Sequence, residues 1–240
     1  MIVCLALFLG SIIGSFLNVI IYRIPRDISI VSPRSYCPHC KIKIPFYRNI
    51  PIISYFIQKG QCAECLKHIS LIYPAVEIIS SLSMMVIWYA FPSIEGILFY
   101  WMFCHLLVLS VIDNEWLQIP LPIIISMSLG LIIYYLINIS EYMFPLLGII
   151  TGLGFILFVY GITWIIYRKN TLGFGDFQLI AILGGWLGQI NIFFVLFLSS
   201  FLALIAFTII SYSKGYNRSR QLPFVPYLSL ASIMIYYINM

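Results

Sequence analysis

Gly173-Phe174-Gly175-Asp176 leads into an apolar run, FQLIAILGGWLGQI at 177–190, that carries no charged side chain. The chain is 62% hydrophobic and only 9% charged, so each acidic residue needs a physical reason. An Asp beside a membrane segment is costly in lipid, and it is a functional-site candidate for that reason. The two glycines allow tight turns and close approaches, so a helix can begin near Asp176. Asp is also a good N-cap, so a purely structural role for Asp176 stays open.

Long apolar runs follow one another through all 240 residues, as in a polytopic membrane protein, and they exclude a soluble one. We predict an all-α polytopic membrane protein with about eight transmembrane helices. A small zinc-binding cytoplasmic domain would lie between the first two helices. The first run has no basic segment before it, so we read it as a retained helix rather than a cleaved signal peptide. The predicted spans are 2–22, 75–91, 95–112, 121–137, 145–167, 177–189, 192–212 and 226–238.

The basic residues predict the orientation of these helices. All 13 Lys and Arg residues fall on one side of the eight-helix arrangement, after the first, fifth and seventh runs. By the positive-inside rule that side is cytoplasmic, and both termini lie outside. Asp113, after the third run, and Asp176, before the sixth, then share the cytoplasmic face. Because the charge is spread over separate loops, we expect no nucleic-acid partner.

Residues 23–73 form the only sizeable polar segment, and it contains two C-x2-C pairs. Each pair can place two thiolates on a tight turn, and two such turns give the four-sulfur site that structural zinc prefers. The segment is too small to fold on an apolar core, so a metal staple makes physical sense. Disulfides are the alternative, disfavoured in a reducing cytoplasm. His39 or His68 could replace one ligand. The expected ligands are Cys37, Cys40, Cys62 and Cys65.

Two further polar residues lie near the cytoplasmic ends of apolar runs. For Asn18 we favour a hydrogen bond between helices over direct contact with a substrate. Glu77 lies about one turn into the second run, where pairing with a basic residue of the polar segment is the simpler reading and ligand binding the alternative. The first run also has small residues near one helical face, where another helix can pack closely, namely Gly10, Ser11, Gly14 and Ser15.

In combination these features resemble the bacterial type IV prepilin peptidases, the GxGD class of membrane aspartyl proteases. The resemblance covers nearly the whole chain, and no single motif carries it alone. The matching stretches are GSFLNVIIYRIP at 14–25, the two cysteine pairs, NIPIISY at 49–55, ISLIYPAVE at 69–77, the Asp113 segment, GFGD at 173–176 and, more loosely, PFVPYLSLA at 223–231.

The resemblance implies a protein of the bacterial inner membrane that cleaves the basic leader of prepilins and pseudopilins after a glycine, at the cytoplasmic face. Members with the cysteine-bearing domain also methylate the new N-terminus with S-adenosylmethionine. Asp113 and Asp176 would be the catalytic pair, supported by Gly173 and Gly175, and the four cysteines would hold structural zinc. The implied domains are a first transmembrane helix at 1–22, a cytoplasmic zinc domain at 23–73 and a transmembrane peptidase domain at 74–240.

The chain departs from the family pattern at four positions. Gln178 stands where the family often has Lys, Leu121 where it has an acidic residue, Ile72 where it has Arg, and Val225 where PFGP has Gly. We read these as divergence in substrate fit, which supports cleavage more firmly than methylation. A peptidase without methyltransferase activity is therefore one alternative, and a membrane transporter or an assembly protein with a zinc-stabilised domain is another. Against a transporter, the apolar runs hold almost no ionisable residues deep enough for an ion path.

Overall fold

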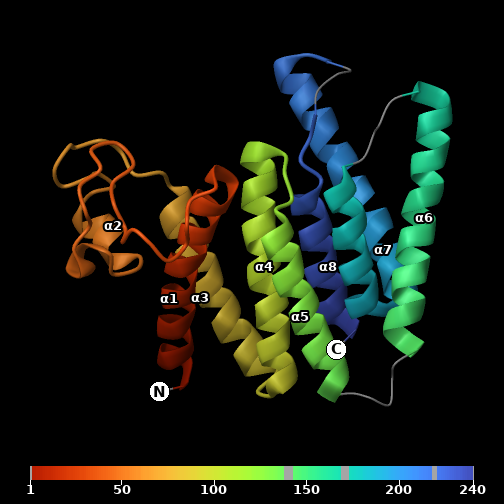
Figure 1. Ribbon diagram of the computed structural model, residues 1–240, viewed down its shortest axis with the longest axis horizontal. Helices are drawn as coiled ribbons and strands as arrows, with labels where there is room; N and C mark the ends of the chain where they lie inside the picture. The colour runs from red at the N-terminus through yellow and green to blue at the C-terminus, as the bar shows by residue number, and fades with distance from the viewer. Residues whose placement is uncertain (1, 138–142, 169–172, 218–220, 240) are drawn as a thin grey trace. The chain divides into compact units, whose positions relative to one another are not determined.

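The computed structural model describes residues 2–137, 143–168, 173–217 and 221–239. Within these ranges the chain is helical, with two isolated β-bridges and no strand, so the prediction of an all-α fold is confirmed. Three of the 13 basic residues counted above, Lys169, Arg218 and Arg220, lie outside the described ranges. The helices are α1 (Ile2–Arg23), η1 (Ile24–Arg26), η2 (Phe46–Arg48), α2 (Ile53–Ile57), α3 (Ile72–Ala90), α4 (Ile94–Trp116), α5 (Leu121–Ile137), α6 (Met143–Tyr167), α7 (Phe174–Lys214) and α8 (Val225–Asn239). Figure 1 labels the α-helices.

Five of the described helices are long and apolar enough to cross a membrane: α1, α3, α4, α6 and α7. Helices α5 and α8 are apolar but shorter. The fold therefore supports a multi-pass membrane protein, and the count of eight crossings stays a prediction. The chain packs as two compact units, Met1–Cys104 and His105–Met240, and the division falls within α4. The predicted domain boundaries at residues 23 and 74 are the positions where the chain is expected to leave and re-enter the membrane. The division into packing units does not test them, so they stay predictions.

In the first unit, α1 and α3 pack closely through small residues. A Cβ placed on Gly10 would lie 2.7 Å from Ser81 Cα, and one on Gly14 would lie 2.7 Å from Glu77 Cα. The Ser80 hydroxyl donates a hydrogen bond across the interface to the Gly10 carbonyl at 2.8 Å. The expected small-residue contact face of the first helix is thus confirmed, and its partner is α3.

In the second unit, α7 folds back on itself at Gly188. That residue has φ +80° and ψ 177° inside an otherwise helical element. A Cβ on Gly152 of α6 would meet Ile192 Cγ1 at 3.2 Å and Ile180 Cγ2 at 3.3 Å. In a straight helix Ile180 and Ile192 would be about 18 Å apart. Helix α7 therefore consists of two arms that lie side by side against α6 (Figure 1).

The two arms correspond to the predicted spans 177–189 and 192–212, but no loop joins them. The chain reverses at a single residue, Gly188, in a region of φ and ψ that is essentially restricted to glycine. A Cβ there would also collide with the ring of Phe144. Gly148 and Gly184 are equally close, since a Cβ on either would collide with the carbonyl of the other. Glycine at these positions lets the bend sit directly against α6.

Hydrogen bonds tie α7 and α4 to their neighbours in this unit. The Tyr135 hydroxyl of α5 donates to the Gly185 carbonyl of α7 at 2.6 Å. The Ser110 hydroxyl of α4 donates to Ser229 Oγ of α8 at 2.9 Å. Such polar contacts between apolar helices fix their rotation and register. The link between α4 and α8 matters for the site because Asp113 lies one turn after Ser110.

Candidate active site and candidate metal centre

Asp113 lies in the last turn of α4, three residues before the helix ends at Trp116. Its side chain is only 6% exposed. The helix terminates where Leu117 adopts a left-handed conformation, φ +53°, and the Leu117 amide donates to the Asp113 carbonyl at 3.0 Å. This tight ending turns the chain away directly after the carboxylate.

The start of α8 holds the Asp113 carboxylate. The amide of Val225, the first residue of α8, donates to Asp113 Oδ2 at 3.0 Å, and the Phe224 amide interacts with the same group. The first amides of a helix have no partner within that helix, and the helix dipole favours an anion there. From the sequence, only the prolines at 223 and 226 indicated a helix start here. Because the contact is made by the main chain, Val225 can provide it as well as the Gly of the family pattern would.

Asp176 lies at the third position of α7, close to the predicted N-terminus. Its Oδ2 accepts a hydrogen bond from the amide of Gly173 at 3.0 Å. Gly173 is the N-cap residue, in an extended conformation with φ −79° and ψ 151°. Asp176 is therefore not the N-cap itself, but its carboxylate accepts a hydrogen bond from the N-cap amide. This structural role does not exclude a chemical one.

The two glycines of the GxGD stretch serve different purposes. A Cβ on Gly175 would lie 2.7 Å from Ile119 Cβ, in the loop that follows α4. A Cβ on Gly173 would meet nothing nearer than Asp176 Oδ2, at 3.4 Å. The missing side chain at Gly175 therefore lets the start of α7 rest against the loop after α4. This contact brings Asp113 and Asp176 close enough for their charges to interact.

The four predicted cysteine ligands converge in the first unit. Their sulfur atoms all lie within 4.8 Å of one another. The Sγ atoms of Cys37 and Cys65 are 3.9 Å apart, and those of Cys40 and Cys62 are 4.0 Å apart. Four sulfurs at about 2.3 Å from a tetrahedral zinc would be about 3.8 Å from one another. The cluster therefore fits a metal ion, all four thiols are free of disulfides, and His39 and His68 are not part of it.

Each cysteine pair forms the same tight turn. The Lys41 amide donates to the Cys37 carbonyl, and the Leu66 amide donates to the Cys62 carbonyl, both at 2.9 Å. Lys41 and Leu66 both have positive φ, +62° and +57°. In the second turn the backbone amides of Cys65 and Glu64 lower the pKa of the Cys62 thiol to about 6. Since the thiolate is the ligand form, metal binding at this cluster would release the protons that the thiols still carry.

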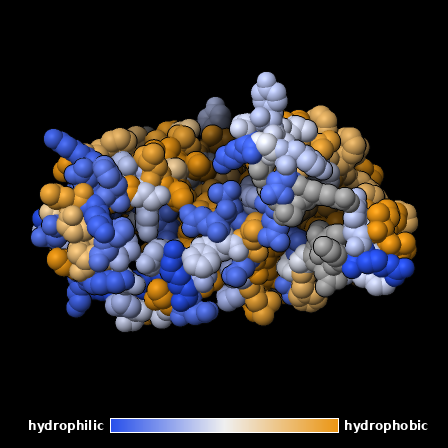
Figure 2. Space-filling view, turned by 90° about the horizontal axis from the view of Figure 1, so that it is seen from above, coloured by the Kyte–Doolittle hydropathy of each residue, from blue (hydrophilic) through white to orange (hydrophobic). Residues whose placement is uncertain are grey.

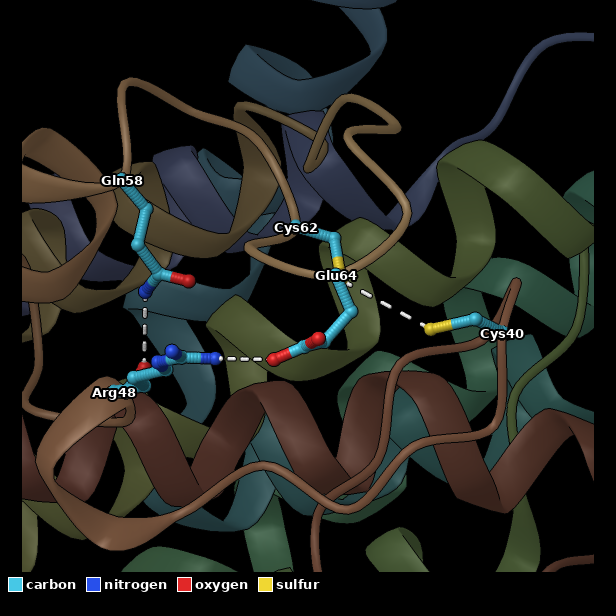
Figure 3. A network of polar contacts seen from close by, with 5 residues as sticks. All are labelled: Cys40, Arg48, Gln58, Cys62 and Glu64. Atoms are coloured by element: carbon cyan, nitrogen blue, oxygen red, sulfur yellow. Dashed lines mark hydrogen bonds and ion pairs between the residues drawn. The ribbon is translucent and has the colours of Figure 1, made fainter.

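A small polar network links the second turn to the residues between the two turns (Figure 3). Arg48 Nη1 lies 2.9 Å from Glu64 Oε1, and Gln58 Nε2 donates to the Arg48 carbonyl at 3.2 Å. The ion pair is partly exposed, so it contributes little to stability. The network orients the turns, whereas a bound metal ion would be the main source of stability for the segment.

Glu77 and Asn18 also lie in the first unit, near the start of α3. Glu77 is 9% exposed, and its Oε2 accepts a hydrogen bond from the Ile52 amide at 2.7 Å. The side chains of Ser15 and Asn18 lie near the same carboxylate. The prediction of a basic partner for Glu77 is therefore wrong, since the group that donates to its carboxylate is the backbone amide of Ile52. Asn18 Nδ2 donates to the Tyr73 carbonyl of α3 at 2.9 Å, which confirms the hydrogen bond expected between helices.

The Ile52 backbone is strained, and sequence reasoning missed it. Ile52 has φ +64° and ψ −56°, and the Ile53 amide donates to the Pro51 carbonyl at 2.6 Å. This is a γ-turn of the rare, strained form, at a β-branched residue that disfavours positive φ. The hydrogen bond to buried Glu77 stabilises it. In the sequence, only Pro51 indicates a turn here, and it does not specify the type of turn.

Comparison with known proteins places both units in described families. Residues 8–91 match the bacterial peptidase A24 N-terminal domain, and residues 100–208 match the type IV leader peptidase family. The prepilin leader peptidase/N-methyltransferases of Pseudomonas putida and Neisseria gonorrhoeae are 30% and 31% identical to this chain, covering 95% and 98% of it and 88% and 90% of the relatives. The type 4 prepilin-like proteins leader peptide-processing enzyme of an Escherichia coli O78:H11 strain is 34% identical over 96% of this chain and 91% of the relative. No solved structure matched.

Proposed function

Since the chain belongs to the type IV leader peptidase family, we propose that it is a membrane aspartic peptidase of the bacterial inner membrane. It cleaves the leader of type IV prepilins or pseudopilins after a glycine, at the cytoplasmic face. The observation that carries this proposal is the pair of interacting carboxylates, Asp113 and Asp176, each held by a backbone amide at a helix terminus.

The chemistry of such a pair explains the cleavage. A water molecule between the carboxylates loses its proton to the ionised one as its oxygen attacks the peptide carbonyl. The other carboxyl is protonated and donates a hydrogen bond to that carbonyl oxygen. Two neighbouring carboxylates titrate as a unit and share one proton over a range of pH, so both forms coexist. Asp113 and Asp176 supply the two roles together.

The membrane location suits a pilin substrate. A prepilin begins with a short basic leader, followed by an apolar helix that can lie in lipid beside the enzyme's helices. The leader then stays at the cytoplasmic face, where the positive-inside rule also places the ends of α4 and α7. The bond between leader and helix would thus meet the two aspartates at the membrane surface.

The cysteine cluster would hold a structural Zn²⁺ ion. Four thiolates in two tight turns are the donor set of closed zinc sites, which stabilise folding and leave no position for a substrate. We assign the metal a role in ordering residues 23–73 and none in the cleavage step. The distances between the sulfur atoms support this fit.

Methylation of the new N-terminus is the second proposed activity. It is supported by the names of the Pseudomonas putida and Neisseria gonorrhoeae relatives, which combine leader peptidase with N-methyltransferase. S-adenosylmethionine would supply the methyl group. The alternative is a peptidase alone, and the departures at Ile72, Leu121 and Gln178 are the features that favour it.

A single assay tests both activities. The detergent-solubilised protein is incubated with a prepilin and S-adenosylmethionine, and the product is examined by mass spectrometry. Loss of the leader mass demonstrates cleavage, and gain of one methyl group demonstrates methylation. Asp113→Asn and Asp176→Asn should each abolish cleavage in a folded protein, whereas the exposed neighbour Glu115→Gln should keep it. Full activity in either Asn variant would rule out the aspartic mechanism.

A further inference from the structure

Helix α2, Ile53–Ile57, turns its apolar side outward. Ile53, Phe56 and Ile57 share one side of the helix and are between 55% and 76% exposed. Ser54, about 100° around the helix from Ile53, is only 7% exposed. A helix on the surface of a soluble domain has the reverse pattern, with apolar residues buried. The outward side of α2 therefore needs a partner that the described residues do not supply.

The polar side of α2 is fixed to η2, which adds more exposed apolar area. Ser54 Oγ donates to the Tyr47 carbonyl at 3.3 Å, and Gln58 donates to the Arg48 carbonyl. The two aromatic residues of η2 are 82% and 56% exposed. We call the five exposed side chains of these two short helices the apolar foot: Phe46, Tyr47, Ile53, Phe56 and Ile57.

The apolar foot begins beside the apolar part of α1, not beyond its end. Ile52, just before α2, donates its amide to Glu77, the sixth residue of α3. Glu77 in turn packs on Gly14, nine residues before the end of α1 at Arg23, a rise of about 13 Å. Figure 1 likewise shows α2 beside the upper half of α1. The chain after α1 thus returns toward the level of the membrane before α3 begins.

The hydrogen bond of Ile52 fits this depth. In lipid, non-helical backbone is tolerated only where the protein itself satisfies its polar groups. The Ile52 amide has such a partner in buried Glu77, although the turn around Ile52 is strained. A turn facing bulk water would not need a buried carboxylate for that purpose.

The charge of the segment indicates which surface it meets. Residues 23–73 contain eight Lys and Arg residues but only Asp27 and Glu64 as acids. A zinc ion with four thiolates would add two negative charges and leave the segment cationic. Figure 2 shows hydrophobic and hydrophilic side chains next to one another at the left, where this segment lies in Figure 1. Apolar side chains among basic residues are typical of helices that lie in an anionic membrane surface.

We propose that the apolar foot is inserted into the headgroup region of the bilayer that α1 and α3 cross, in the leaflet on the side of the cysteine cluster. Its partner is anionic phospholipid. The basic residues of the segment bind the headgroups, and the five apolar side chains reach the start of the acyl chains. The cysteine-bearing segment is then held at a fixed height on the membrane by the foot as well as by its two flanking helices.

Photocrosslinking of the full, zinc-loaded chain tests this. A photoreactive benzoyl-phenylalanine is placed at Phe56, and the protein is reconstituted in nanodiscs of phosphatidylcholine with one-third phosphatidylglycerol. The control places the same group at Val31, which is 87% exposed and follows the end of α1. We expect lipid adducts several-fold more often at Phe56 than at Val31, with phosphatidylglycerol in excess of its share of the lipid. A zinc content equal to that of the wild type shows that each labelled protein is folded. If the protein labelled at Phe56 is not folded, the photoreactive group is placed at Ile57 instead.

The other occupants of the foot would give different products. Adducts of Phe56 with another part of the chain, with a second copy or with added pilin, in place of lipid, would overturn the proposal. Lipid adducts no more frequent at Phe56 than at Val31 would overturn it too. Adducts in proportion to the bulk lipid composition would exclude the anionic partner.

Discussion

The amide of Val225 donates a 3.0 Å hydrogen bond to Asp113 Oδ2, although 112 residues separate the two. The contact ties the start of α8 to the end of α4 and orients one of the two proposed catalytic groups. Its donor is a main-chain atom, so substitutions that keep the amide should keep the bond. Proline removes the amide and is accepted at the first position of a helix, so it isolates this one interaction.

We therefore expect Val225→Pro to lower the rate of prepilin cleavage by roughly 10- to 100-fold, because a hydrogen bond to a charged group is worth about 1.5–3 kcal/mol. Val225→Ala is the matched control, since it also trims the buried side chain but keeps the amide. It should cost stability and retain most of the cleavage rate. Equal losses of rate in both variants would show that the side chain, not the amide, matters.

Gly175→Ala should impair cleavage strongly, whereas Gly173→Ala should have a small effect. The Cβ at position 175 would lie 2.7 Å from Ile119 Cβ and push the start of α7 away from the loop after α4. At position 173 the backbone is extended and the space is open. The double variant Gly175→Ala with Ile119→Ala should recover part of the activity. The reverse ranking of the two glycines would contradict the assigned contact.

Gly188→Ala should destabilise the second unit. The positive φ of this residue costs a side chain about 1–3 kcal/mol, and the new Cβ would also collide with Phe144. Thermal unfolding in detergent should show a clearly lower midpoint. Gly154→Ala in α6 is the control, because a Cβ there meets nothing within 4 Å and alanine favours a helix. An unchanged midpoint for Gly188→Ala would mean that α7 does not bend as described.

Elemental analysis should find one zinc ion per chain. Cys37→Ser or Cys62→Ser should lower the zinc content and make residues 23–73 sensitive to limited proteolysis, whereas exposed Cys4→Ser should do neither. Cleavage should partly survive zinc loss, because Asp113 and Asp176 lie in the other unit. A wild-type protein free of metal, with its cysteines oxidised in pairs, would refute the zinc assignment.

Reporter fusions should resolve the topology. A reporter inserted near Asn49 or Gly215 should read as cytoplasmic, and one at the C-terminus as external, because all basic residues fall on one side of eight crossings. The bend at Gly188 bears directly on this result. Because its two arms run side by side in opposite directions, α7 would begin and end on the same side of the membrane, so a C-terminus that reports from the cytoplasm would contradict the count of eight crossings.

The metal cluster could be predicted from sequence because its signal is local. Two cysteines on one turn need only a short spacing, and both pairs lie in the one sizeable polar segment of the sequence. Asp113 and Asp176 stood out for a different reason, since charge is rare in so apolar a chain. The small residues of the first helix likewise predicted a close helix contact, although not that α3 makes it.

The features that escaped prediction depend on contacts between distant segments. The amide of Val225 is the same in any sequence, so nothing marked it as a partner of Asp113. No polar loop marks the reversal at Gly188 in the sequence. The glycines around it are equally consistent with a face that packs against another helix. For Glu77 the abundant basic residues nearby suggested an ion pair, but the Ile52 amide occupies that place.

The first arm of α7, Phe174–Leu187, is about 21 Å long, whereas the hydrocarbon core of a bilayer is about 30 Å thick. Asp176 lies at one end of this arm and the bend at Gly188 at the other, so they cannot both reach the level of the headgroups. Either the bilayer is indented on one side of α7, or the bend at Gly188 stays inside the membrane, buried against α6. An indentation on the side of Asp176 would carry water down to the carboxylates. A pilin could then be cut without its apolar helix being lifted out of the membrane.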